Sequence, residues 1–225
     1  MRIWAIGDLH LSFDKTGKIT KPMVKFGANW QNHEEKIFSH WQEKVQEEDW
    51  VLLAGDISWA MKPQEAIYDL LWLKNLPGQK VLVKGNHDYW WQGTGKTKTL
   101  LEPMLPLYNN ALEIGPFVLC GGRGYQETSD NTDEKLKMRE YARVKTSLEA
   151  GDALNKEIIV LLHYPPYDED GKDNIFSELL AKYEPKAIIY GHLHNKENIY
   201  RKTLGKIKMY PVSADYLDFN LQLIL

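Results

Sequence analysis

The stretch IIYGHLHN, residues 188–195, ends an apolar run with two histidines spaced two positions apart. The run has the length and composition of a buried strand, and Gly191 allows the chain to leave it sharply. His192 and His194 then fall where the chain turns polar. Because this arrangement of strand, glycine and polar side chains recurs elsewhere in the chain, it is the best guide to the fold.

Five apolar runs end in a polar loop of this kind, and in four of them the loop begins with glycine. They are residues 2–6, 50–54, 80–84, 157–162 and 187–190, followed in turn by GDLH, GDIS, GNHD, HYPP and GHLH. Continuous apolar runs are typical of strands covered on both faces. Helices predicted near residues 31–48 and 63–75 alternate with the first strands, which favours parallel pairing through right-handed crossovers. The five loops should therefore converge beyond the carboxyl ends of the strands.

Two regions depart from this rhythm. Residues 89–154 contain predicted strands at 112–114 and 117–120 and a long polar helix from about Asp133, and they are a candidate cap or insert over a substrate. Within them, GTGKT resembles a phosphate-binding loop but has Trp90 where that motif needs glycine, so we expect a loop that enters a helix. Residues 198–212 predict a hairpin around Leu204 and Gly205, and FNLQLIL predicts a last strand.

Composition bounds the class of protein. With 225 residues, 43% hydrophobic and 26% charged, the chain should form a single domain over residues 1–225. A net charge of -3 makes nucleic acid an improbable partner. Cys120 has no second cysteine to pair with, and neither a signal peptide nor a membrane span is evident, so a cytoplasmic location is expected.

The strand-end loops are rich in metal-binding side chains. Five of the seven histidines lie in them, together with Asp8, Asp56, Asn86 and Asp88. Imidazole and carboxylate ligands suit Mn, Fe or Zn, and no set of thiolates exists for a structural zinc site. His33 and His40 fall outside these loops and are interpreted as ordinary helix residues.

The ordered set of motifs resembles the calcineurin-like metallophosphoesterases from Asp8 to His194. The resemblance implies an α/β fold, namely a four-layer α/β/β/α sandwich of two packed mixed sheets flanked by helices. GDISWA lacks the Asp-Arg pair common in the second motif, DLHL lacks a frequent glycine, and Asp88 stands where protein Ser/Thr phosphatases usually have glutamate. These departures disfavour a protein phosphatase but leave every expected metal ligand in place.

The resemblance also implies a site with two divalent or trivalent metal ions, Mn, Fe or Zn. One ion would be held by Asp8, His10 and His194, the other by Asn86, His163 and His192, with Asp56 bridging them. The implied activity is a metal-dependent phosphohydrolase that cleaves a small phosphorylated substrate with a metal-bridging hydroxide. His87 is expected to protonate the leaving group, and Asp88 to orient or stabilise His87.

Several points stay open at this level. Trp59, Trp90 and Tyr164 either stack on a flat substrate or pack beneath the loops, and Arg123 is a candidate phosphate clamp. Arg139 and Arg143 on the predicted long helix either clamp a phosphate in the same way from a cap or, as the preferred interpretation, pair as surface charges with Glu140 and its neighbours. The alternatives are a nuclease or cyclic-nucleotide phosphodiesterase of the same family and a noncatalytic scaffold. The substrate, the choice between monoesters and diesters, the metals and the oligomeric state are left undetermined.

Overall fold

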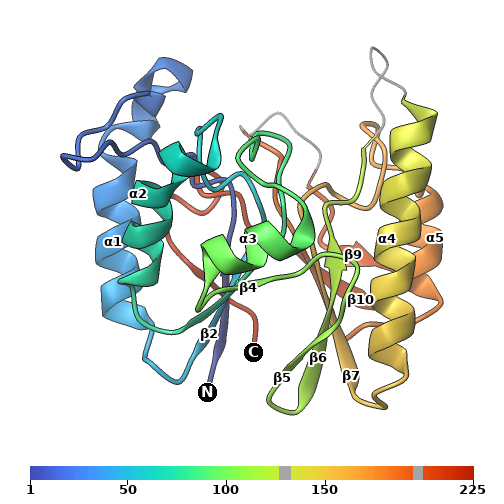
Figure 1. Ribbon diagram of the computed structural model, residues 1–225. Coiled ribbons are helices and arrows are strands. Elements are labelled where there is room, and N and C mark those ends of the chain that lie inside the picture. The colour runs from blue at the N-terminus through green and yellow to red at the C-terminus, as the bar shows by residue number, and fades with distance from the viewer. Residues whose placement is uncertain (127–132, 195–199) are drawn as a thin grey trace.

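Two mixed sheets packed face to face form the centre of the protein in the computed structural model (Figure 1), which describes residues 1–126, 133–194 and 200–225. The first sheet has five strands in the order β11-β1-β2-β3-β4, and the second has six in the order β5-β6-β7-β8-β10-β9. The first contains β1 (Ile3–Ile6), β2 (Trp50–Leu53), β3 (Gln79–Leu82), β4 (Leu105–Pro106) and β11 (Gln222–Leu223). The second contains β5 (Leu112–Ile114), β6 (Phe117–Gly122), β7 (Glu157–Leu162), β8 (Ala187–Tyr190), β9 (Thr203–Leu204) and β10 (Ile207–Pro211).

Helices cover the outer faces of both sheets. They are α1 (His33–Lys44), α2 (Pro63–Lys74) and α3 (Thr94–Leu101) on the side of the first sheet, and α4 (Glu134–Asp152) and α5 (Ile175–Ala181) on the side of the second. Two short 3-10 helices, η1 (Met23–Phe26) and η2 (Ala28–Trp30), precede α1. The predicted four-layer α/β/β/α arrangement is thereby confirmed.

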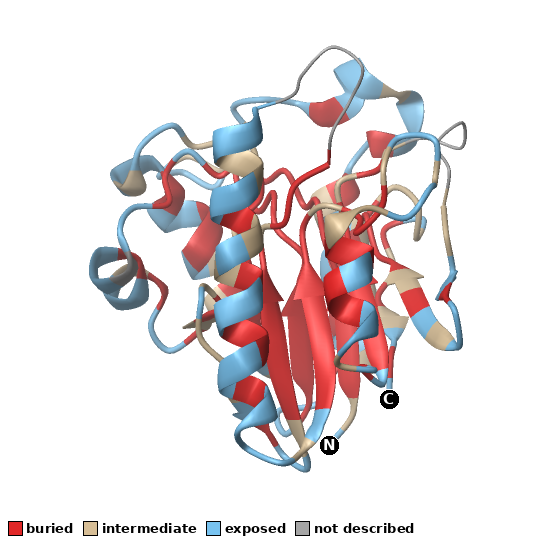
Figure 2. Cartoon of the chain, turned by 90° about the vertical axis from the view of Figure 1, so that its right-hand side faces the viewer, coloured by how far each residue is buried: buried red, intermediate tan, exposed pale blue. Residues whose placement is uncertain are grey.

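Strand alternation divides the core into three layers. Ile3 and Ala5 of β1 point between the sheets, whereas Trp4 and Ile6 point toward α1 and α2. On the other side, alternate residues of β6, β7 and β8 pack against α4 and α5. Figure 2 shows that the central strands are buried along most of their length while the helices keep an exposed face. Coverage on both faces explains why the strands read as continuous apolar runs.

The register brings the strand ends together. Ile6, Leu53 and Leu82 are aligned across β1, β2 and β3, and Leu162 is aligned with Tyr190 across β7 and β8. All of these pairs are parallel, as predicted. The two sheets also join here, because the Gly7 amide donates to the Val212 carbonyl over 2.7 Å. The five polar loops therefore share one end of the sandwich.

Some elements differ from the predictions. The first helix spans 33–44 rather than 31–48, because Asn32 adopts a left-handed conformation and Val45 is extended. The segment 89–154 contributes α3, β4, β5, β6 and α4 to the sandwich itself. Its role as a substrate cover stays a prediction, and residues 127–132 lie outside the described part. The hairpin of β9 and β10 confirms the predicted turn after Leu204. Residues 198 and 199, which were expected to begin its first strand, lie outside the described residues. Within the described ranges, no helix is both long and apolar enough to cross a membrane.

Candidate metal centre

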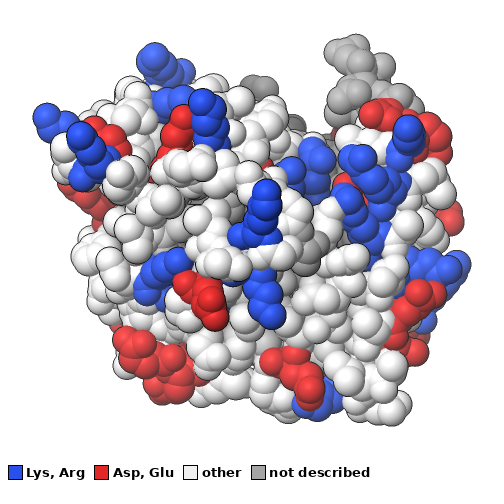
Figure 3. All heavy atoms as spheres, in the orientation of Figure 1, with Lys and Arg blue, Asp and Glu red and all other residues white. Residues whose placement is uncertain are grey.

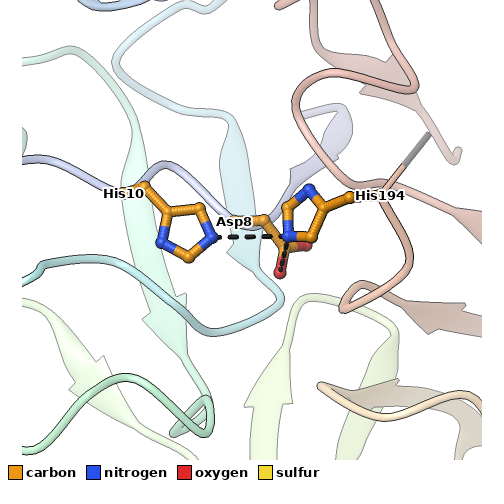
Figure 4. A group of neighbouring side chains, drawn as sticks. All are labelled: Asp8, His10 and His194. Carbon is orange, nitrogen blue, oxygen red and sulfur yellow. Dashed lines mark hydrogen bonds and ion pairs between the residues drawn. The ribbon is translucent and has the colours of Figure 1, made fainter. Parts of the chain in front are cut away.

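Asp8, His10 and His194 form one group of facing ligand atoms (Figure 4). The Nε2 atoms of the two histidines lie 3.4 Å apart, and Nε2 of His194 lies 3.7 Å from Oδ1 of Asp8. Asp8 and His10 are buried, whereas His194 is partly exposed. Two ring nitrogens and a carboxylate oxygen therefore point at a common centre, which fits a divalent cation.

Asn86, His163 and His192 form a second group. The Asn86 side-chain oxygen lies 2.6 Å from Nε2 of His163 and 3.0 Å from Nδ1 of His192. On its other side, His163 Nδ1 lies 2.8 Å from the carbonyl of Ala54, so that nitrogen carries the proton and Nε2 is left with a lone pair. Neutral amide and imidazole donors of this kind suit a second cation.

Asp56 lies between the two groups. Its Oδ2 atom is 3.9 Å from Nε2 of His10 and 3.7 Å from Nε2 of His163, while its Oδ1 accepts the backbone N–H of His87 over 2.8 Å. Asp8, Asp56 and His163 also fall within one ligand cluster. A carboxylate that faces both groups is the feature needed to hold two ions close together.

The backbone is strained where these side chains leave it. Asp8, His10, Asp56 and His192 all have positive φ, between 48° and 72°. Such conformations cost free energy for residues with a side chain and concentrate at functional sites. Each of the four lies in the loop that follows a strand.

Close packing also requires glycine at Gly85. A Cβ atom there would lie 2.0 Å from Oδ1 of Asp56 and 2.2 Å from its backbone nitrogen. These separations are far shorter than any tolerated contact, so only glycine lets the loop after β3 approach the loop after β2. The glycine of the third motif is therefore required for steric reasons.

Burial sets the protonation of these groups in the metal-free protein. It raises the pKa values of the Asp8 and Asp56 carboxyl groups, because the charged forms lose hydration. Burial likewise lowers the pKa of His163 to about 3 and those of His10 and His192 well below 6.5. Buried carboxyl groups that resist ionisation, set beside neutral imidazoles, form an environment that bound cations would stabilise.

Asp215 is a residue of the site that the sequence motifs did not indicate. Its Oδ1 atom lies 2.9 Å from Nδ1 of His194. Burial acts to lower the pKa of His194, but the Asp215 hydrogen bond and the charges of Asp8, Asp215 and Asp56 outweigh it and raise that pKa to about 9. Asp215 follows β10, and the only signal available in the sequence was an acidic residue shortly after a strand.

Asp88 has a different environment from the one expected. Its carboxylate accepts hydrogen bonds from the backbone N–H groups of Ile57, Ser58 and Gly85 and from Nε1 of Trp90, at 2.8–3.2 Å. Among the described hydrogen bonds none joins it to His87. Asp88 therefore fastens two of the site loops together, and its effect on His87 stays a prediction.

His87 and Trp59 line a cavity of about 290 Å³ beside the first ligand group, together with Phe26 and Trp30. The Trp59 ring stacks on that of His10, with centroids 4.7 Å apart and planes inclined by 22°, and lies 4.6 Å from the His87 ring. Aromatic side chains at this wall offer a surface to a flat or apolar group.

The other candidate substrate residues lie elsewhere. Trp90 is fully buried, which favours the second of its two predicted roles, packing beneath the loops, over stacking on a substrate. Tyr164 is partly buried, and its ring lies 4.2 Å from that of His192. Arg123 lies over the Tyr164 ring at 5.5 Å, close to the second ligand group.

Comparison with known proteins agrees with this site. The sequence model of the calcineurin-like phosphoesterases matches residues 1–196. The chain therefore belongs to the calcineurin-like phosphoesterase family and is a hydrolase that acts on phosphoric ester bonds. The family match together with the Asp and His groups described above identifies it as a metal-binding member.

Among curated proteins, the chain is similar to the Gene 66 proteins of two mycobacteriophages. It is 26% identical to that of Mycobacterium phage D29 over 95% of this chain and 87% of the relative, and 23% identical to that of phage L5 over 85% and 77%.

Among solved structures, TT1561 of Thermus thermophilus superposes with a TM-score of 0.64 at 15% identity over 99% of this chain and 98% of the other. Phosphopantetheinyl hydrolase from Mycobacterium tuberculosis gives 0.61 at 14% identity, over 100% and 95%. At such low identities these likenesses concern the fold alone.

Proposed function

We propose that the protein is a dinuclear metallophosphohydrolase that cleaves a small phosphorylated substrate. One ion would be held by Asp8, His10 and His194, the other by Asn86, His163 and His192, with Asp56 between them. The position of the Asp56 carboxylate within 4 Å of Nε2 of both His10 and His163 is the observation that carries the proposal. When bound, two such ions supply a hydroxide-like nucleophile from water and neutralise charge on the phosphoryl group.

His87 is the proposed general acid. It is partly exposed in the wall of the 290 Å³ cavity, and its backbone N–H is fixed by Asp56, so its ring is held beside the centre while remaining accessible to a leaving group. A histidine ring in this position can give a proton to a departing alkoxide. Trp59 would pack against the same leaving group, and Arg123 and Tyr164 would contact the substrate beside His192.

Metal analysis and a substrate panel test the function. The chain would be stripped with a chelator, reloaded with Mn, Fe or Zn, and assayed on phosphomonoesters, phosphodiesters and nucleotides. We expect two bound ions per chain and turnover of at least one class. His192→Ala should lose one ion preferentially and retain the other. A fully loaded protein that turns over none of these substrates would favour the noncatalytic scaffold instead.

The role of His87 has its own test. His87→Ala should keep both ions but lose far more activity on alkyl phosphates than on aryl phosphates, whose leaving groups depart without a proton. His40→Gln is a matched control, because His40 contacts the carbonyl of Phe219 and lies outside the ligand groups. Equal losses on the two kinds of substrate would contradict the assignment.

The net charge of -3 disfavours the nuclease alternative, since affinity for the phosphates of a polynucleotide comes mainly from a basic protein surface. Salt-sensitive binding of DNA would revive it. The cytoplasmic location and the choice among Mn, Fe and Zn remain part of this proposal.

A further inference from the structure

A second cavity, of about 190 Å³, lies beside α4 and is rich in basic side chains. We call it the basic pocket and define it by Lys84, Arg123, Arg139 and Arg143, which line it with Glu140. Figure 3 shows Lys and Arg side chains gathered around the upper part of α4. A concave surface with four cations is unexpected in a chain of net charge -3.

Little of this charge is neutralised within the pocket. The buried Glu140 carboxylate contacts Nη1 of Arg143 at 2.5 Å and lies 3.7 Å from Nε of Arg139. The Nε atom of Arg123 is buried without a hydrogen-bond partner. The sequence-based pairing of Arg143 with Glu140 is therefore correct, but one carboxylate leaves an excess of positive charge, which attracts anions.

The basic pocket adjoins the candidate metal centre. Lys84 precedes the Gly85-Asn86 turn after β3, and the Arg123 carbonyl accepts the backbone N–H of His163 over 3.2 Å after β6. The Arg123 guanidinium lies over Tyr164, whose ring is in turn 4.2 Å from that of His192. Arg123 thus connects the second ligand group with the pocket.

We propose that the basic pocket binds a second phosphate group of the substrate while the scissile phosphoester lies at the metal centre. The substrates would then be phosphoesters that carry another phosphate, such as bisphosphates. The planar forks of Arg139 and Arg123 and the ammonium of Lys84 match phosphate oxygens, and this second group would be held but not cleaved. The assignment rests on the proposed function, since it presumes hydrolysis at the neighbouring centre.

A binding experiment isolates the pocket from catalysis. Pyrophosphate would be titrated by calorimetry into the full chain stripped of metal, using wild type and the variant Lys84→Gln/Arg139→Gln. Arg143 is left in place because its loss would strand Glu140. The control Lys135→Gln/Lys145→Gln removes the same charge from exposed positions of α4. We expect affinity to fall about tenfold or more in the pocket variant only, as for loss of a charge-assisted hydrogen bond. Equal binding by all three proteins would overturn the proposal.

A catalytic experiment then separates substrate recognition from binding of a free anion. The metal-loaded proteins would be assayed on alkyl monophosphates and on alkanediol bisphosphates of increasing chain length. We expect wild type and control to prefer a bisphosphate through a lower KM, and this preference to fall about tenfold in the pocket variant. Pyrophosphate binding without any preference for bisphosphates would indicate a site for a free anion and would overturn the substrate assignment. If no ester is cleaved while pyrophosphate binding depends on the pocket, the proposed function fails but the anion site stands.

Discussion

Asp215 holds the His194 ring by its Nδ1 atom, 2.9 Å away, and so turns Nε2 of that ring toward Asp8 and His10. The two residues come from loops that follow neighbouring parallel strands, β8 and β10. A carboxylate that accepts the outer N–H of a metal-binding histidine fixes the tautomer and raises the basicity of the inner nitrogen. The contact therefore links the packing of the second sheet to the chemistry of the site.

The first prediction concerns this contact. Asp215→Asn should weaken binding of the ion at the Asp8, His10 and His194 group by about tenfold to a hundredfold, with little change at the other group. Metal content after dialysis against a graded chelator measures the effect. Asp218→Asn is the control, because Asp218 is exposed and has a positive φ that asparagine tolerates. Equal metal content in the two variants would show that Asp215 does not support the site.

The second prediction follows from proton binding by the metal-free protein. The pKa of His194 is about 9 in the folded chain and near 6.5 in the unfolded chain, so the folded state binds more protons between these values. The stability contributed by His194 is therefore complete below about pH 6.5 and is lost as pH rises through about 9. The raised pKa of Asp8 acts in the same direction.

Metal binding must displace these protons, so metal affinity should rise over the same pH range. Melting temperatures of chelated and Mn-loaded protein, recorded from about pH 6.5 to 9, provide the measurement. The chelated protein should become less stable, and the gap between the two forms should widen. In His194→Gln the fall should be shallower. A chelated wild type that gains stability over this interval would show that the sign is wrong.

The third prediction compares two glycines. Gly85→Ala should cost about 2 to 3 kcal/mol of stability and abolish tight metal binding, because the new methyl group would collide with Asp56. Gly95→Ala, in α3, meets nothing within 4 Å and should leave both properties unchanged or add slight stability. Denaturant unfolding together with metal analysis would separate the two. A Gly85→Ala protein with normal metal content would exclude the close approach of the two loops.

The ordered motifs were sufficient to predict the sandwich, and the side chains proposed as metal ligands lie together at one end of it. The reason is that each motif directly follows a parallel strand, and residues that directly follow parallel strands lie at the same edge of the sheet. Asp215 was not predicted because its contact with His194 depends on the pairing of β10 with β8. No local sequence pattern indicates that pairing. The helix α5 and the strand β4 were missed for a related reason, since each is too short to show a period.

The sequence also could not show which of the aromatic residues after β3 are buried. Tyr89 is 57% exposed, whereas Trp90 is fully buried, although both follow the same motif. The difference arises because the Trp90 indole donates to Asp88 beneath the loops, a contact that depends on the loop conformation. Residue type alone could not distinguish a ring that meets substrate from one that supports the site.

The fourth prediction concerns Trp90. Trp90→Phe keeps a buried ring but removes the N–H donor to Asp88, so it should lower stability by about 1 to 3 kcal/mol. Since the side chain is fully buried, KM should not change for any substrate. Thermal unfolding and steady-state kinetics of the same preparation measure both effects. A raised KM with unchanged stability would restore a role in stacking on the substrate.

The last prediction concerns Trp59, whose partly exposed ring stacks on His10 and lines the cavity beside His87. Trp59→Ala removes an aromatic wall, so KM should rise about fivefold to tenfold for aryl phosphates, in line with about 1 kcal/mol for an aromatic pair. Alkyl phosphates, which have no ring to stack, should be affected less. Trp59→Phe keeps an aromatic face and should recover most of the loss. If the alanine variant raised KM equally for both kinds of ester, Trp59 would act by positioning His10 rather than by contacting the leaving group.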